Sequence, residues 1–234
     1  MKIIITGASR GIGYDTALAL AEDEQHHVLA ISRNSVRLDD LKSEAHRRYG
    51  YDHIDTLSFD LTDPDWAKLA VAVRKLGGVD ILINNAGLLI NKPFAELDAA
   101  DWQRLFAVNF FSAVEMIKHL LPEFRRADQP HILNVSSMGG FQGSSKFPGL
   151  TGYSTSKAAL SNLTECLAEE FKNDGIAVNC LALGAVQTEM LNEAFPGMQA
   201  PVSSEHMADF MAYFATRGHA FFNGKVLPVS VSTP

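Results

Sequence analysis

Tyr153 and Lys157 are the residues whose types and spacing best suit proton chemistry. They stand four residues apart at the start of a helix-compatible run, residues 154–172, and positions i and i+4 of a helix share one face. A tyrosine has an ordinary pKa of about 10, and a nearby ammonium favours the phenolate and lowers that pKa. The pair therefore suits proton transfer near neutral pH. Taken alone, Tyr-x-x-x-Lys is a weak pattern, more often an ordinary helix start with a surface lysine.

The elements that must position this pair follow from strand-length apolar runs that alternate with helix-length segments. We expect strands at residues 2–6, 28–31, 56–59, 79–83, 131–135, 176–181 and 225–229. We expect helices at residues 11–24, 36–49, 64–76, 99–124 (as one or two), 154–172 and 204–215, with Asp63 capping the third and Pro64 at its first position. Such alternation predicts right-handed βαβ units. The expected fold is α/β, a doubly wound parallel sheet with helices on both faces, in three layers.

Composition predicts one domain over residues 1–234 and argues against two classes of partner. Hydrophobic residues make up 47% of the chain and charged residues 20%, which is ordinary for a globular protein. The formal net charge of −7, with no basic stripe, argues against nucleic acid or an anionic membrane as a partner. No apolar run reaches the roughly 18–20 residues of a membrane span. Since the start resembles no signal peptide, we expect a cytoplasmic protein.

The two cysteines, Cys166 and Cys180, are too few and too far apart for a metal site or a disulfide framework. Both lie in apolar runs. We therefore expect two buried free thiols in a reducing compartment, and no metal.

The first strand-to-helix turn, residues 6–13, reads Thr-Gly-Ala-Ser-Arg-Gly-Ile-Gly. Its glycines permit a tight turn, close approach of the backbone to a pyrophosphate and close packing of helix on strand. A phosphate would sit on the first amides of the helix, where the dipole favours an anion. The alternative is a glycine-rich turn without a ligand. The dinucleotide-binding residues expected here are Gly7, Ser9, Arg10, Gly11, Ile12 and Gly13.

The end of the second strand indicates which dinucleotide is bound. An acidic residue here would accept hydrogen bonds from the ribose 2′-hydroxyl of NAD, but Ser32 and Arg33 stand there instead. A guanidinium suits a 2′-phosphate, and Arg10 is placed to reach the same phosphate. We therefore favour NADP(H) and leave NAD(H) open. The alternative is that Arg33 is a solvated loop residue.

Polar and small residues also end the third and fourth strands, at the edge where ligands bind in this architecture. Asp60 is a candidate acceptor for an adenine amino group, with Leu61 packing nearby; a turn aspartate is the alternative. Asn85, Ala86 and Gly87 end the fourth strand, and their small size leaves room for a cofactor. Asparagines that satisfy the turn backbone are a second interpretation, compatible with the first.

The ordered set of these segments resembles the short-chain dehydrogenase/reductase family, over residues 2–188 and more faintly to 229. The resemblance includes the glycine turn, Asn-Asn-Ala-Gly at 84–87, Asn-Val-Ser-Ser at 134–137 and Tyr-x-x-Ser-Lys at 153–157. It implies a single Rossmann-like domain that binds NAD(P). It also implies that Gly184, Val186 and Thr188 close over the nicotinamide amide, although Leu183 replaces the proline that is common in the family.

The resemblance further implies a site and a mechanism. Ser137 would hydrogen-bond the substrate oxygen, and Tyr153 would give that oxygen a proton or remove one. Lys157 would lower the tyrosine pKa and bind the nicotinamide ribose. Asn109 would hold a water that connects Lys157 to solvent. The hydride would pass between the nicotinamide and the substrate.

The expected function is therefore that of a carbonyl reductase or alcohol dehydrogenase acting on a small molecule. The alternative is a regulatory protein of the same fold that binds a dinucleotide without turnover. The short stretch 189–201 predicts an open pocket. Five residues suggest a mainly apolar wall, with a place in the core or in a subunit contact as the alternative for each: Phe141, Phe147, Met190, Phe195 and Met198.

Assembly is predicted from two helices. The segment 109–124 and the helix of Tyr153 spread apolar residues over more than one face, and surplus apolar surface marks an interface. The resemblance implies that these helices pair across a two-fold axis. We expect a homodimer, or a homotetramer through a second contact. The alternative is that a broad apolar face of these helices simply packs on the sheet.

Overall fold

A seven-stranded parallel sheet forms the centre of the computed structural model, which describes residues 1–231. Residues 232–234 of the predicted domain lie outside the described residues. The strand order is β3-β2-β1-β4-β5-β6-β9. The strands span Lys2–Thr6 (β1), His27–Ser32 (β2), Ile54–Ser58 (β3), Ile81–Asn84 (β4), His131–Ser137 (β5), Ala177–Leu183 (β6) and Val226–Val229 (β9). The doubly wound sheet expected from the sequence is therefore confirmed.

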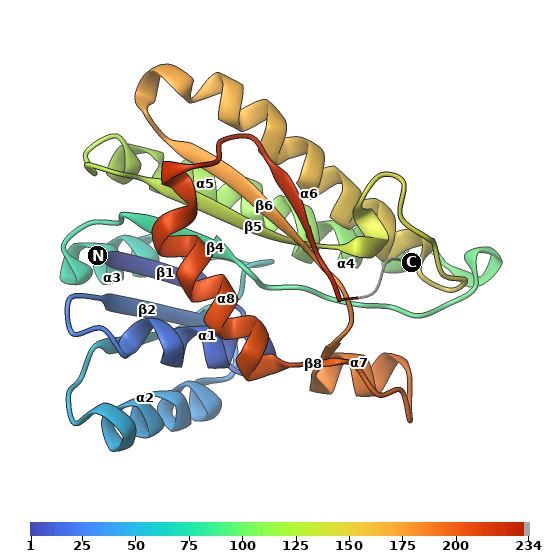
Figure 1. The fold of residues 1–234 in the computed structure, drawn as a ribbon, viewed down its shortest axis with the longest axis horizontal. Coiled ribbons are helices and arrows are strands. Elements are labelled where there is room, and N and C mark those ends of the chain that lie inside the picture. Colours follow the sequence, from blue (N-terminus) through green and yellow to red (C-terminus); the bar gives the residue numbers. More distant parts are fainter. Residues whose placement is uncertain (232–234) are drawn as a thin grey trace.

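Helices cover both faces of this sheet (Figure 1). Three lie on one face: α1 (Gly11–Ala21), α2 (Ser35–Tyr49) and α8 (Ser204–Arg217). The other face carries α3 (Trp66–Leu76), α5 (Ser112–Phe124) and α6 (Thr151–Glu170), with α4 (Ala99–Phe106) leading into α5. The three layers put the carboxyl ends of all seven strands at one edge.

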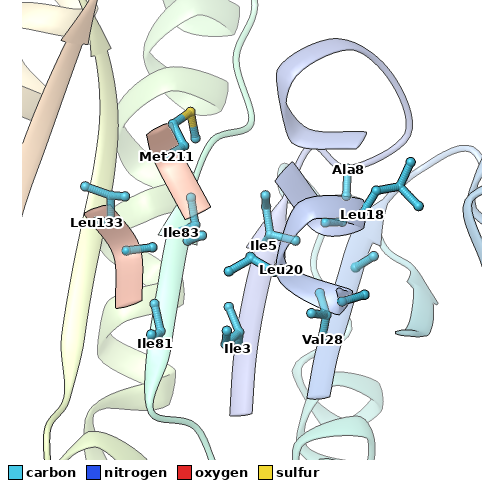
Figure 2. Close-up of a cluster of buried hydrophobic side chains, with 14 of the residues drawn as sticks. Ile3, Ile5, Ala8, Leu18, Leu20, Val28, Ile81, Ile83, Leu133 and Met211 are labelled. Atoms are coloured by element: carbon cyan, nitrogen blue, oxygen red, sulfur yellow. The ribbon is translucent and has the colours of Figure 1, made fainter. Parts of the chain in front are cut away.

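Alternation along the strands explains the two layers of core. Ile3 and Ile5 pack under α1 and α8, while Ile4 between them packs under α5, because successive side chains of a strand point to opposite faces. All three are fully buried, and each such burial contributes roughly 1.5–3 kcal/mol. Figure 2 shows part of the first cluster, drawn from strands β1, β2, β4 and β5 and helices α1 and α8.

The strand order reverses at β1, which pairs with β2 on one side and β4 on the other. In open α/β sheets this switch point leaves a crevice at the carboxyl ends of the strands, where ligands bind. The glycine turn after β1 and the Asn-Asn-Ala-Gly segment after β4 both lie at that edge.

Several predicted boundaries and environments were wrong in detail. The helix α3 begins at Trp66, and its cap is Asp65, whose carboxylate accepts from the Lys68 amide at 3.1 Å; Asp63 and Pro64 precede it. The helix α6 begins at Thr151, so Tyr153 lies inside its first turn. Cys180 is buried as expected, but Cys166 is exposed, because it lies on the side of α6 away from the sheet.

A small unit after β6 was not predicted. It contains β7 (Val186–Gln187), the six-residue helix α7 (Glu189–Ala194) and β8 (Val202–Ser203), which pairs with β7. In Figure 1 α7 lies at the carboxyl edge, on the side of the sheet where α1 and α2 lie. The stretch 189–201, whose shortness predicted an open pocket, is thus partly helical.

The helical run Ala99–Phe124 is long and apolar enough, by length and composition alone, to cross a membrane. This departs from our expectation that no segment reaches that length. However, Met116, Leu120 and Phe124 are buried against the sheet, so the apolar side of the run forms part of the core.

Candidate active site

Helix α6 carries Tyr153 and Lys157 at the carboxyl edge of β5. Lys157 is buried and its Nζ donates to the Val135 carbonyl at 2.8 Å. Burial lowers the pKa of this lysine to about 8, since a charged ammonium loses hydration there. Tyr153 is half-buried, and burial raises its pKa above the ordinary value, opposed by a hydrogen bond with Ser137. Lys157 is not among the groups that shift the pKa of Tyr153 here, and the expected lowering of that pKa by Lys157 stays a prediction.

Ser137 ends β5 and faces Tyr153 because of how the next turn packs. Its hydroxyl accepts from the Gly139 amide at 3.1 Å and shares a hydrogen bond with the Tyr153 hydroxyl. A Cβ added at Gly140 would lie 2.6 Å from the Ala158 backbone nitrogen, so only glycine lets this turn rest on α6. The structure thus brings together Ser137, Tyr153 and Lys157, as the sequence predicted.

Asn109 lies in a π-helical segment, Ala107–Phe111, between α4 and α5, and such bulges are frequent at functional sites. Its Oδ1 accepts from the Leu88 amide at 2.7 Å. Its Nδ2 donates to the Leu88 carbonyl and to Ser156 Oγ, both at 2.9 Å. Both amide protons are therefore used in joining the segment after β4 to α6, and the predicted water-holding role stays a prediction.

The glycine turn and the end of β4 form one cradle. Thr6 Oγ1 accepts from the amides of Asn85 and Ala86, each at 3.1 Å. Asn85 Nδ2 donates to the Thr6 carbonyl at 3.0 Å. A Cβ added at Gly7 would lie 2.8 Å from Ala86 Cα, and one at Gly13 would lie 2.3 Å from Asn85 Nδ2. These contacts explain why glycine stands at both positions.

The N-terminus of α1 fits an anion. Its N-cap, Arg10, makes no side-chain cap bond, and no acidic residue stands in the first turn. The first amides therefore keep their capacity to bind a phosphate. Around them, Gly11 lies against Thr188, with an added Cβ 3.4 Å from Thr188 Cγ2, and Ile12 packs partly into the core.

The subsite at the end of β2 includes an arginine that the sequence analysis missed. Ser32 Oγ donates to Ser9 Oγ at 2.8 Å, which ties the strand end to the glycine turn. Arg33 is exposed, and within residues 1–231 its guanidinium forms no ion pair. Arg10 instead pairs with carboxylates of α7. Arg37, in the first turn of α2, was missed; its position four residues after Arg33 was the available signal.

The remaining predicted cofactor residues lie after β3 and after β4. Asp60 accepts from the amide and hydroxyl of Thr62 at 2.9 and 2.7 Å, as the turn interpretation expects, and Leu61 packs partly against the core. An added Cβ at Gly87 would lie 3.5 Å from Lys157 Nζ and 3.6 Å from Asn109 Oδ1. The backbone of Gly87 therefore borders the catalytic candidates.

The opposite wall comes from the segment after β6. Gly184 packs against Ser230, Val186 is buried, and the Thr188 hydroxyl caps α7 by accepting from the Leu191 amide at 3.2 Å. A cavity of about 240 Å³ lies between the segment after β4 and α7. Its lining residues are Arg10, Gly87, Leu88, Leu89, Asn91, Met190, Glu193 and Ala194.

This lining contains few of the residues expected to form an apolar wall, so that expectation stays a prediction. Of the five predicted residues only Met190 lines the cavity, while Phe147 and Met198 face solvent. Arg10, Asn91 and Glu193 supply polar groups in their place. Among the described residues no cluster of histidine, cysteine and carboxylate side chains is suited to a metal ion.

A doubly wound sheet with a glycine cradle at its switch point defines a Rossmann-like protein of the dinucleotide-binding class. The family model for short chain dehydrogenases matches residues 1–199. The chain therefore belongs to the short-chain dehydrogenase/reductase family of oxidoreductases.

Curated relatives agree with this assignment. Gluconate 5-dehydrogenase of Gluconobacter oxydans (strain 621H) is 32% identical, over 97% of this chain and 92% of that protein. The 3-oxoacyl-[acyl-carrier-protein] reductase FabG of Thermotoga maritima is 33% identical, over 80% of this chain and 74% of its own.

Solved structures show the same fold. L-sorbose reductase from Gluconobacter frateurii, complexed with NADPH and L-sorbose, matches with a TM-score of 0.87 and 25% identity, over 99% of this chain and 95% of that one. The 3-ketoacyl-(acyl-carrier-protein) reductase from Brucella melitensis, complexed with NADH, matches with a TM-score of 0.86 and 25% identity, over 97% and 96% of the two chains.

Proposed function

We propose that the protein is an NADP(H)-dependent carbonyl reductase or alcohol dehydrogenase that acts on a small molecule. The observation that carries this proposal is the hydrogen bond between Ser137 and Tyr153 beside buried Lys157. Two hydroxyls that share a proton can both address one substrate oxygen. A regulatory protein that only bound a dinucleotide would have no use for that pair.

Tyr153 would serve as the proton donor when the reaction runs as a reduction. Burial keeps its hydroxyl protonated at neutral pH, so it can donate a proton to the oxygen of a carbonyl as that oxygen gains charge. Ser137 would hold the same oxygen. Lys157, with a pKa of about 8, keeps its charge at pH 7, and Val135 takes only one of its three N–H groups. The bound nicotinamide would supply the hydride.

Gly87 both lines the polar cavity and borders the catalytic candidates. We therefore propose that the cavity holds the substrate and that its polar groups favour a hydroxylated or charged substrate over a purely apolar one. Asn91 and Glu193 line the cavity beside Met190. Two of the named relatives, gluconate 5-dehydrogenase and L-sorbose reductase, carry polyhydroxylated compounds in their names. We therefore propose sugar-like ketones or keto acids as the first substrates to test.

The test of catalysis is Tyr153→Phe, which removes the hydroxyl and leaves the ring. Turnover of NADPH with the best ketone of a panel should fall by about 10²-fold or more, while NADPH binding changes by less than about twofold. Tyr213→Phe is the matched control, because Tyr213 lies on α8 with 62% of its surface exposed. Turnover of the Tyr153 variant within about tenfold of the wild type would contradict the assignment.

A wild-type protein that binds NADPH but consumes none with any ketone, aldehyde or diketone of the panel would favour the regulatory alternative. The panel should pair polyhydroxylated ketones with apolar diketones. Faster turnover of the apolar members would contradict the proposed substrate class.

The preference for NADP(H) over NAD(H) rests on charge at the end of β2. The strand β2 ends without an acidic residue that would accept from a ribose 2′-hydroxyl, and the side chains of Arg33 and Arg37 reach solvent nearby, with Arg37 paired to Glu189 of α7. A charge-assisted bond to a 2′-phosphate contributes roughly 1.5–3 kcal/mol. Isothermal titration should therefore show about tenfold or tighter binding of NADP⁺ than of NAD⁺. Equal affinities would contradict this preference.

We further propose a homodimer built on α5 and α6. The core takes up three apolar side chains of this region: Ile117, Leu120 and Phe124. Others remain at the surface, since Phe111 is 55% exposed and Val114 and Leu121 are only partly buried. Apolar side chains left at the surface of a helix favour association.

A further inference from the structure

Two arginines of the cofactor subsite are held by one carboxylate of α7. Glu189 pairs with Arg37 through contacts of 3.1 and 2.9 Å and with Arg10 at 3.2 Å. The chain separates Glu189 from these partners by 152 and 179 residues. Glu189 therefore stands between the glycine turn and the first turn of α2, where Ser9 and Ser32 already join the two segments.

These ion pairs link α7 to the glycine turn and to α2. All six residues of α7 are described, and none is fully buried. Glu193 adds a second carboxylate on Arg10. The Arg37 guanidinium, followed by that of Arg10, holds the pKa of Glu189 below its usual range, so Glu189 carries its full charge at neutral pH.

We propose that Glu189 is an internal competitor for the 2′-phosphate of the cofactor, and that it sets the strength of phosphate recognition by occupying Arg37 and Arg10. Both guanidiniums border the subsite in which Arg33 is expected to read the phosphate. A phosphate dianion and the Glu189 carboxylate would accept hydrogen bonds from the same guanidinium N–H groups and therefore compete for them. The inference rests on the proposed NADP(H) preference, and makes Glu189 a positioning residue that acts through the arginines.

The geometry makes this competition reversible. The side chains of Arg10, Arg37 and Glu189 are 37%, 43% and 49% exposed, and ion pairs at such exposure are weak. A phosphate with more charge and three acceptor oxygens can therefore displace the carboxylate. Binding of a 2′-phosphate must still break the ion pairs of Glu189 with Arg37 and with Arg10. Removing the Glu189 charge should therefore tighten phosphate binding by about three- to tenfold.

The test uses two probes that lack the nicotinamide, 2′,5′-ADP and 5′-AMP, in calorimetry on the full chain. Glu189→Gln should bind 2′,5′-ADP about three- to tenfold more tightly than the wild type, and 5′-AMP within about twofold. Unchanged 5′-AMP binding also shows that the site is intact. Glu193→Gln is the matched control, because it removes the same charge from the same helix and contacts Arg10 alone; its effect should be smaller.

A double-variant cycle with Arg37→Met separates direct competition from a general change in charge. In that background the logarithmic gain from Glu189→Gln should fall to less than half. An equal gain in both backgrounds, an equal gain from Glu193→Gln, or a gain for 5′-AMP as large as that for 2′,5′-ADP would each overturn the proposal. Failure of the NADP(H) preference is a separate outcome, since wild-type affinities for NADP⁺ and NAD⁺ measure it without any variant.

Discussion

His131 should make the stability of this protein fall below neutral pH. It is the first residue of β5 and is fully buried. Its Nδ1 lies 2.8 Å from the Ala215 carbonyl, and its Nε2 lies 3.1 Å from Asn179 Nδ2. The amide of Asn179 is oriented by accepting from the Lys225 amide at its other end. The imidazole must therefore donate from Nδ1 and accept at Nε2, which is the neutral form.

Burial lowers the pKa of His131 from 6.5 to about 4. Among the described residues the only charged neighbour that shifts it is His219, whose own pKa burial also lowers. The unfolded chain therefore binds a proton between pH 6.5 and 4 that the folded chain does not. Stability is complete above about pH 6.5 and declines as the pH falls through this window. Between pH 7 and 4.5 the loss is about 2 kcal/mol.

Urea unfolding followed by tryptophan fluorescence, at several values from pH 7 to 4.5, measures this loss. His131→Gln keeps a donor and an acceptor but does not titrate, so its stability should fall by about 2 kcal/mol less over the same range. Carboxylates titrate in both proteins and cancel in the comparison. Equal losses would refute the reasoning. Should the variant not fold, the His131 ring resonances of the wild type serve instead: titration above about pH 5.5 gives the same refutation.

Two further predictions concern the site and the assembly. Gly140→Ala should reduce turnover by about tenfold or more with 5′-AMP binding retained, because its Cβ would lie 2.6 Å from backbone atoms of Lys157 and Ala158 and push Ser137 from Tyr153; full activity would contradict this. Light scattering with gel filtration at micromolar concentration should give a dimer, and a mass near the 25.5 kDa of one chain would exclude it.

The strands and their order along the chain could be predicted, because the apolar residues that a strand buries stand next to one another in the sequence. Ile3, Ile4 and Ile5 form a run that is apolar on both faces, and only a strand covered by helices on both sides buries such a run. The first residue of each helix could be predicted less closely. Asp63 and Asp65 are equally good caps by type, and only the backbone path decides that the Asp65 carboxylate reaches the Lys68 amide.

The residues proposed for the catalytic edge could be named from the sequence because each motif lies within a few positions of the chain, whereas Arg37 and the cavity lining could not. Gly7 and Gly13 were predicted because the turn leaves no room for a larger residue. In the structure a Cβ at these positions would lie too close to Ala86 and Asn85. Ser137 and Tyr153 were named separately from their own segments. Their hydrogen bond depends on the turn at Gly140, whose fit against α6 no local pattern describes.

The sequence by itself determined the fold class, the family and the types of residue at the catalytic edge, because hydrophobic periodicity and short motifs encode them locally. Only the tertiary structure decided that Lys157 points to the Val135 carbonyl and that the cavity is polar. It also decided that Glu189 meets Arg37 across 152 residues of chain. Such contacts join side chains whose spacing in sequence carries no signal, so they exist only once the sheet has brought their elements together.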